Sequence, residues 1–426
     1  MIVQKIIKVI AGILFVACVI YFFCIFFGGK CSLTKGVDAR VGDPGAVIDL
    51  GLLDRSFPDM TEWAKAGVEG GIPLRADVPI RIVINPGDDI QKAIDEVAQK
   101  QYGVVLLSPG RYVINKNIEM RSGVVLRGMD PNKCIIEISL LSEERWDWIT
   151  YGIVMRKCQW TGIEDLTIIH AAVTDIPLKT YRGIYKNDMQ NISNLHVGHV
   201  AVVNCLNCWV DNCRLLFSGT NPIQIWNSKH ITNRSNVIFE SFNKGGKLNG
   251  YYLIEGSSYV LCCNEIISGI RHLSIQGGSK FNVIYNCYLE VDVNFHSRDG
   301  GHNLVEGCLV ALPKYHIWSP VASYQTPRGE GNILYNVEVF DKRGGKNYMY
   351  FRDNDKKTNT SVVYENNTVF GISVQDPPLV YRVDINPPKH QTLFPISGRC
   401  VSANTLRERL NSENGIRSSA TLANTR

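Results

Sequence analysis

The chain has 426 residues, 45% of them hydrophobic and 20% charged, with a formal net charge of +5. This composition excludes a disordered protein and provides enough apolar residues for one large core or two modest ones. Lys and Arg are spread along the chain without the clustering that marks a nucleic-acid-binding face, so we expect no nucleic-acid partner.

The first apolar segment, Val9–Phe27, is about as long as the ~20 residues that cross a hydrocarbon core as a helix. Lys5 and Lys8 precede it, as in a signal sequence, but no small-residue cleavage site follows. We therefore interpret residues 1–30 as an uncleaved signal anchor with a transmembrane helix. The remainder is expected outside the cytoplasm, at the cell surface or in the periplasm. Secretion after signal cleavage is the alternative.

Residues 31–76 contain scattered Gly and Pro, and we interpret them as a linker and N-terminal cap. The stretch 81–85 then alternates like a strand and is followed by a turn at Pro86–Asp88. Asp89 is a suitable N-cap for a helix. The helix is indicated by the apolar spacing of Ile90, Ala93, Ile94 and Val97.

The segments Asp88–Asp95 and Gly103–Tyr112 together resemble the entry segment of the pectate-lyase-like superfamily. In that superfamily a capping helix opens a right-handed parallel β-helix. The resemblance covers roughly residues 78–130 directly and implies the fold more specifically than the activity, because the superfamily includes lyases, hydrolases, epimerases and phage tailspikes. No specific member is identified by these motifs.

An internal repeat independently predicts a solenoid further along the chain. Short apolar strings, each of a few residues, recur at intervals of 21 to 29 residues, and each carries Asn or Gly at the same place. These residue types suit a left-handed backbone position in a stacked turn. The positions aligned in this column are Asn212, Asn236, Asn264, Asn286, Gly307 and Asn336.

These observations predict an all-β chain: a single-stranded solenoid, the right-handed parallel β-helix, over residues 77–370, with the N-terminal capping helix and the N-terminal transmembrane helix before it. Residues 371–426 lose the repeat, and we expect an extended segment, a short helix and a disordered tail. The chain has 13 cysteines, and most are expected to be small apolar core residues. The alternative is that one or two disulfides form, if the domain lies in an oxidising compartment.

Chemistry is expected on the outer face of the solenoid, because alternate residues of a strand point outward and neighbouring coils stack about 4.8 Å apart. Two consecutive coils, residues 271–280 and 292–302, are unusually rich in polar side chains. The side chains expected on one flank are His272, Gln276, Asn294, His296, Arg298, Asp299, His302 and His316, with Arg271, Lys280, Tyr252, Trp226 and Trp318 around them.

This set of residues suits β-elimination at a uronic acid of an acidic polysaccharide. The reaction needs a base for the proton next to the carboxylate and a cation for the charge that develops. We expect His296 or His272 to be the base and Arg271 or Arg298 to be the clamp. The substrate-binding candidates are Gln276, Lys280, Asn294, His302, His316, Trp318, Trp226 and Tyr252.

Three carboxylates near the same coils, Asp292, Asp299 and Glu255, are candidate ligands for a hard cation such as Ca²⁺. They are also the candidates for the paired carboxylates of a glycoside hydrolase. A C5-epimerase would share the first proton abstraction with a lyase. A non-catalytic glycan-binding or structural surface protein is the remaining alternative, and the sequence does not choose among these.

Overall fold

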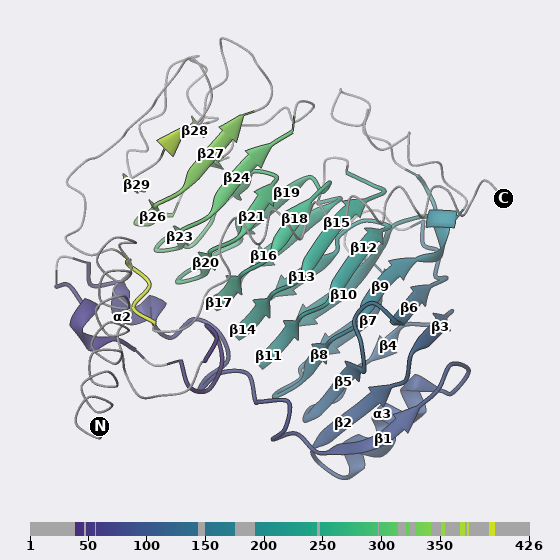
Figure 1. Cartoon of the computed structure of the whole chain (residues 1–426). Coiled ribbons are helices and arrows are strands. Elements are labelled where there is room, and N and C mark those ends of the chain that lie inside the picture. Colours follow the sequence, from purple (N-terminus) through teal and green to yellow (C-terminus); the bar gives the residue numbers. More distant parts are fainter. Residues whose placement is uncertain are drawn as a thin grey trace, which may run out of the picture. The chain divides into compact units, whose positions relative to one another are not determined.

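Three parallel β-sheets form the fold, and successive turns of the chain add strands to each of them in rotation (Figure 1). The computed structural model describes residues 39–46, 48–55, 57–143, 150–174, 192–244, 248–296, 298–313, 321–323, 329–341, 351–353, 367–370, 373–374 and 392–396. All of them belong to one structural unit, Ala39–Arg426.

Sheet 1 contains the most strands within the described ranges. In spatial order it consists of β1 (Ile80–Ile84), β2 (Gly103–Leu107), β5 (Val124–Gly128), β8 (Gly162–Glu164), β11 (Leu206–Asp211), β14 (Lys229–Arg234), β17 (Ser258–Cys263), β20 (Val283–Tyr285), β23 (Leu304–Glu306), β26 (Asn332–Tyr335) and β29 (Asn367–Phe370).

Sheet 2 carries the candidate site. Its strands are β4 (Ile118–Glu119), β7 (Thr150–Arg156), β10 (Val197–Val203), β13 (Ile223–Trp226), β16 (Tyr251–Glu255), β19 (His272–Gln276), β22 (Val293–Phe295), β25 (Val321–Ser323) and β28 (Phe351–Asp353).

Sheet 3 completes each coil. Its strands are β3 (Gly110–Ile114), β6 (Cys134–Ile138), β9 (Thr167–His170), β12 (Arg214–Ser218), β15 (Val237–Ser241), β18 (Ile266–Ser268), β21 (Tyr288–Glu290), β24 (Leu309–Leu312), β27 (Glu338–Asp341) and β30 (Ser373–Val374).

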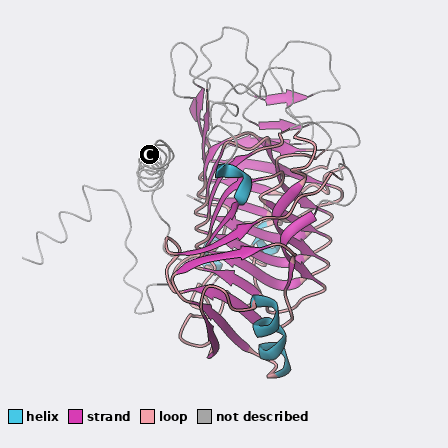
Figure 2. Cartoon of the chain, turned by 90° about the vertical axis from the view of Figure 1, so that its right-hand side faces the viewer, coloured by secondary structure: helices cyan, strands magenta, loops and turns pink. Residues whose placement is uncertain are grey.

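Each strand pairs in parallel with the strand one coil away, as between β16 and β19 or β19 and β22. Figure 2 shows the resulting stack of strands from the side. This pairing confirms the predicted parallel β-helix, and right-handed winding is the rule for parallel crossovers. The interior is filled by stacked apolar side chains, for example Ile225, Ile254 and Ile275 from successive coils of sheet 2.

The predicted capping helix is present as α3 (Ile90–Gln99), which packs against β1, β2, β4 and β5. The Asp89 side chain accepts a hydrogen bond from the Lys92 backbone N–H at 3.0 Å, as an N-cap does. The four apolar residues that predicted the helix are all buried. Each large apolar side chain among them contributes about 1.5–3 kcal/mol by leaving water.

The predicted column of left-handed residues follows the strands of sheet 1, with one correction. Asn236 was the wrong residue for its coil: Ser235 has the left-handed conformation, with a φ of +57°. The Asn236 side chain points inward, where its Oδ1 accepts from the Cys213 N–H at 2.9 Å. The left-handed residues are Asn212, Ser235, Asn264, Asn286, Gly307 and Asn336.

The described part of the predicted linker and cap lies along the outer face of sheet 1. We call residues 39–76 the strap; it contains η1 (Leu50–Leu52) and α2 (Met60–Trp63). The Trp63 side chain is buried and donates to the His302 carbonyl at 2.8 Å. A short stretch of the C-terminal region, 392–396, joins the strap through an antiparallel bridge between Ile48 and Ile396.

Arginine–carboxylate pairs fasten the strap to sheet 1. Arg234 binds both oxygens of Asp211, at 2.9 and 2.7 Å, and reaches Asp43 of the strap at 2.6 Å. Arg75 of the strap contacts Asp211 at 2.8 Å and Glu164 at 2.9 Å. Burial alone would raise the pKa of Asp211, but these arginines lower it, so the carboxylate stays charged.

The nine cysteines within the described ranges are free thiols and are buried, as predicted for core residues. The other four, Cys18, Cys24, Cys31 and Cys400, lie outside the described residues. So do residues 1–38, and with them the predicted transmembrane helix. Within the ranges that are described, no helix is both long and apolar enough to cross a membrane.

Candidate functional site

The outer face of sheet 2 aligns polar side chains in register across three coils. Glu255 of β16 pairs with Gln276 of β19, and His296 directly follows Phe295 of β22 in the next coil. Two residues away along each strand, Ser274 pairs with Asn294. The sequence therefore predicted correctly that these outward positions share one sheet.

The centre of this face is a pair formed by His272 and Asp292. The Nδ1 atom of His272 lies 2.8 and 2.7 Å from the two carboxylate oxygens of Asp292. Both side chains are almost completely buried, at 3% and 0% exposure. A carboxylate at Nδ1 holds the proton on that nitrogen and leaves Nε2 as the acceptor, which is the arrangement of a general base.

Tyr251 and Arg271 lie beside this pair. The Tyr251 ring packs edge-on against His272, with the ring centroids 4.9 Å apart. The Arg271 guanidinium carbon is 6.0 Å from the centre of the Tyr251 ring, and Arg271 donates to the Lys244 carbonyl at 2.9 Å. Burial raises the pKa of Tyr251, while Arg271 opposes the rise, so its phenol is protonated at neutral pH.

A second histidine on the face, His296, is held neutral. Burial lowers its pKa to about 4, and the neighbouring His272 and Arg271 act in the same direction, against the carboxylate of Asp292. Burial also raises the pKa of Glu255, against the effect of its hydrogen bond with Gln276. The polar edge formed by Glu255 and His296 is partly exposed, in contrast to the buried His272 and Asp292.

Tyr252 was wrongly assigned to this face, because its side chain points into the interior. It is fully buried, and its hydroxyl accepts from Asn233 and donates to Glu265 at 3.1 Å. Tyr251 takes the outward position beside His272. The sequence could have shown this. Leu273 was predicted to point inward, and Tyr252 is its partner on the neighbouring strand. Paired residues face the same side of a sheet, so Tyr252 points inward as well.

Lys280 and His302 were also placed on the wrong sheet, since both precede strands of sheet 1. Lys280 bridges to Ser258, the first residue of β17. The His302 side chain contacts Asp59 of the strap at 2.8 Å and lies beside the Phe281 ring. At these positions the chain has already passed from sheet 2 to sheet 1.

Asp299 shapes a turn instead of facing a ligand. One of its oxygens accepts from the Gly301 N–H at 3.1 Å and from the Asn332 side chain at 2.7 Å, and the other from the Gly329 N–H at 3.1 Å. Arg298, just before it, is exposed in the same turn. His316 and Trp318 lie outside the described residues.

The predicted calcium ligands do not converge. Asp292 is bonded to His272 and Asp299 to turn residues, which leaves Glu255 without a second carboxylate from the proposed set. Within the described ranges, no cluster of three or more His, Cys, Asp or Glu side chains is arranged to hold a metal ion. We therefore assign no step to a metal ion at these three carboxylates.

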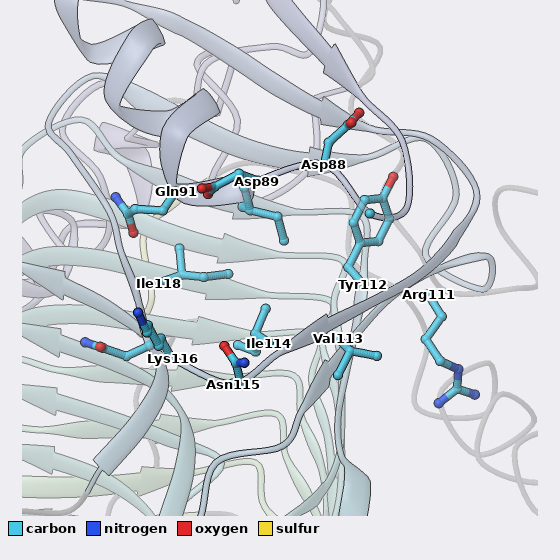
Figure 3. Close-up of a pocket in the computed structure, with 13 residues that line it drawn as sticks. Asp88, Asp89, Gln91, Arg111, Tyr112, Val113, Ile114, Asn115, Lys116 and Ile118 are labelled. Atoms are coloured by element: carbon cyan, nitrogen blue, oxygen red, sulfur yellow. The ribbon is translucent and has the colours of Figure 1, made fainter.

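A separate hollow of about 710 Å³ lies beside the capping helix, between the start of α3 and the segment that joins β3 to β4. In Figure 3, Asp89 and Gln91 face Ile114, Asn115 and Ile118 across it. Its acidic groups serve the backbone, because Asp89 caps α3 and Asp88 accepts from the Asn85 N–H at 2.7 Å. Because these two carboxylates already accept backbone hydrogen bonds, the outer face of sheet 2 is the better candidate for catalysis.

We compared the chain with protein families, curated proteins and solved structures. The sequence matches no protein-family model and no curated protein. Among solved structures, the endo-xylogalacturonan hydrolase from Aspergillus tubingensis is 13% identical with a TM-score of 0.42, covering 75% of this chain and 99% of that one. The catalytic domain of a GH87 α-1,3-glucanase in complex with nigerose is 12% identical with a TM-score of 0.42, covering 71% of this chain and 54% of that one.

A third structure, the A-module of a mannuronan C-5 epimerase from Azotobacter vinelandii, is 13% identical with a TM-score of 0.26 and covers 68% of this chain and 95% of that one. The chain spans about half the length of the glucanase structure and nearly all of the other two.

Proposed function

We propose that the chain is an enzyme that cleaves an acidic polysaccharide by β-elimination at a uronic acid, on the outer face of sheet 2. The observation that carries the proposal is the His272–Asp292 pair with Tyr251 and Arg271 directly beside it. A base, a protonated phenol and a fixed cation are the three groups that this reaction requires.

His272 is the base in this proposal. Asp292 accepts a hydrogen bond from Nδ1–H and stabilises the imidazolium that forms when Nε2 takes the proton from C5 of the uronic acid. The electron pair of the broken C–H bond forms a double bond between C4 and C5. The bond from C4 to the glycosidic oxygen breaks, and the Tyr251 hydroxyl gives that oxygen a proton, because burial keeps its pKa high.

Arg271 stabilises the charge that accumulates on the substrate carboxylate as C5 loses its proton. Its guanidinium is positioned by the hydrogen bond to the Lys244 carbonyl, so little reorganisation is needed when the charge develops. His296, whose pKa of about 4 keeps it neutral, adds no competing positive charge and serves as a hydrogen-bonding group at the partly exposed edge.

A hydrolase with two catalytic carboxylates is less well supported. Such an enzyme needs two carboxyl groups roughly 5–9.5 Å apart across the substrate. Asp292 is hydrogen-bonded to His272, and Asp299 accepts hydrogen bonds within its turn. Glu255 is therefore the remaining carboxyl group of the predicted set. An epimerase would use the same base and clamp but would leave the glycosidic bond intact.

The test is incubation of the purified chain with alginate, polygalacturonate and glycosaminoglycans. A lyase produces a conjugated double bond, read by ultraviolet absorbance, together with shortened chains. Reducing ends without that absorbance would indicate a hydrolase, and inverted C5 stereochemistry without cleavage an epimerase. Retained binding without any of these products would contradict the proposal and favour a glycan-binding surface protein.

The apolar run Val9–Phe27 adds a proposal about location. We infer that the enzyme acts at an extracytoplasmic surface, anchored by this run, where polysaccharides are available. Protease treatment of intact cells, followed by detection of the remaining fragment, tests both the anchoring and the orientation.

A further inference from the structure

One outward column of sheet 2 continues well beyond the proposed reaction centre. In register, Arg156 of β7 pairs with Val203 of β10, which pairs with Trp226 of β13, and Trp226 pairs with Glu255 of β16. The column then passes through Gln276 to His296. The register therefore places one outward side chain per coil in a column that crosses sheet 2 to the candidate site.

The far end of this column is open to solvent. Arg156 is exposed, and Trp226, at 40% exposure, is among the most exposed aromatic side chains of the described ranges. Beside them, the outward side chains of Tyr151, Val154 and Ala201 form an apolar cluster with Val203. The cluster residues Tyr151, Val154 and Ala201 are themselves buried, so the exposed Trp226 ring is the surface that suits the non-polar face of a sugar.

The guanidinium of Arg156 is available for a ligand, since no described residue forms an ion pair with it. Arg121, an exposed arginine that follows β4, differs in this respect: its Nε contacts Asp95 at 2.9 Å. An exposed guanidinium in the same column as the exposed Trp226 ring is suited to a carboxylate, which it can bind through two parallel hydrogen bonds.

We propose that Arg156, Val203 and Trp226 form a distal subsite for a carboxylate-bearing sugar of the same polysaccharide chain whose reacting sugar lies at His272. This inference rests on the proposed function. Arg156 lies four coils from His272, which is roughly 19 Å at the spacing of neighbouring strands. The substrate would therefore run across the strands of sheet 2 and would need several sugar units to reach both places.

The experiment measures affinity as a function of chain length. Full-length protein carrying His272→Gln, which removes the proposed base, is titrated calorimetrically with oligogalacturonates and oligomannuronates from the disaccharide to the octasaccharide. We expect the parent to bind long chains more tightly than disaccharides. Adding Arg156→Gln should weaken long-chain binding about five- to tenfold, the loss of one charge-assisted pair, and leave disaccharide binding unchanged.

Two further variants separate a charge contact from a general disturbance. Arg156→Lys should retain part of the gain in affinity with length, because it keeps the charge but loses the two-pronged geometry. Arg81→Gln removes an exposed arginine from sheet 1 and should change nothing. The subsite is refuted if Arg156→Gln binds long chains as tightly as the parent, even when disaccharides bind and the wild-type enzyme is active. Absence of both binding and turnover with every uronate would instead overturn the proposed function, and the subsite with it.

Discussion

The imidazole of His272 and the carboxylate of Asp292 meet across two neighbouring coils, with Nδ1 at 2.8 and 2.7 Å from the two oxygens. The contact depends on the pairing of β19 with β22, which sets Asp292 one residue before the strand that lies against His272. A shift of one residue in this register would point one of the two side chains into the interior. The parallel stack therefore fixes the orientation of the proposed base.

Asp292→Asn should lower the elimination rate by about 100-fold or more, because an amide no longer favours the tautomer with an unprotonated Nε2. The affinity for substrate should change little, since Asp292 is buried behind His272. Initial rates across a range of substrate concentrations separate these effects. Asp130→Asn, in an exposed turn before β6, is the matched control and should leave the rate unchanged. An Asp292→Asn enzyme with wild-type kcat would show that the pair is structural.

The fold was predictable from local patterns in the sequence. The capping helix follows from the spacing of Ile90, Ala93, Ile94 and Val97, and the coils follow from the recurrence of Asn and Gly at one turn. Ser235 shows the limit of such an alignment, because Asn236 matches the residue type but the neighbouring serine adopts the turn. Residue type alone does not distinguish two adjacent polar positions when one of them points inward.

The site was predictable only in part, for two physical reasons. Alternation assigns inward and outward sides within a strand, and it placed His272, Asn294 and His296 together correctly. It does not say where a coil turns from one sheet to the next, so His302 was assigned to sheet 2 although it lies on sheet 1. Contacts with the strap, such as that between His302 and Asp59, join residues distant in sequence and leave no local pattern.

Glu265→Gln should stabilise the protein at alkaline pH. Glu265 is fully buried, and burial raises its pKa to about 7 against the hydrogen bonds from Asn236, at 2.8 Å, and Tyr252, at 3.1 Å. Because the folded pKa is raised above the ordinary value of 4.5, the unfolded chain releases the proton first. The folded state therefore loses stability as pH rises from about 4.5 to about 7, by up to about 3 kcal/mol.

Urea unfolding of wild type and Glu265→Gln at pH 5 and pH 8 measures this effect. The variant should gain relative to wild type at pH 8 and much less at pH 5. An equal difference between wild type and Glu265→Gln at both pH values would contradict the raised pKa.

The column of left-handed residues makes opposite predictions for two substitutions at one position. Ser235 has a φ of +57°, a conformation that costs an ordinary L-residue about 1 kcal/mol or more and glycine almost nothing. Ser235→Gly should therefore be neutral or stabilising, whereas Ser235→Val should destabilise by about 1–2 kcal/mol, because a β-branched side chain is least tolerated there. Thermal unfolding of both variants decides the point. Equal stability of the glycine and valine variants would show that the turn rearranges.

Arg234→Met should release the strap from sheet 1. Arg234 is 1% exposed and neutralises Asp211 and Asp43, so its removal leaves buried carboxylates with less compensation and should cost about 3–5 kcal/mol. Limited proteolysis should then cut within residues 39–76 before it cuts the coils. Arg111→Met, on the exposed face of β3, removes an arginine paired with Glu137 and should change the cleavage pattern little. If the strap of Arg234→Met resists protease as well as that of wild type, its apolar contacts through Val41, Met60 and Trp63 hold it without the buried charges.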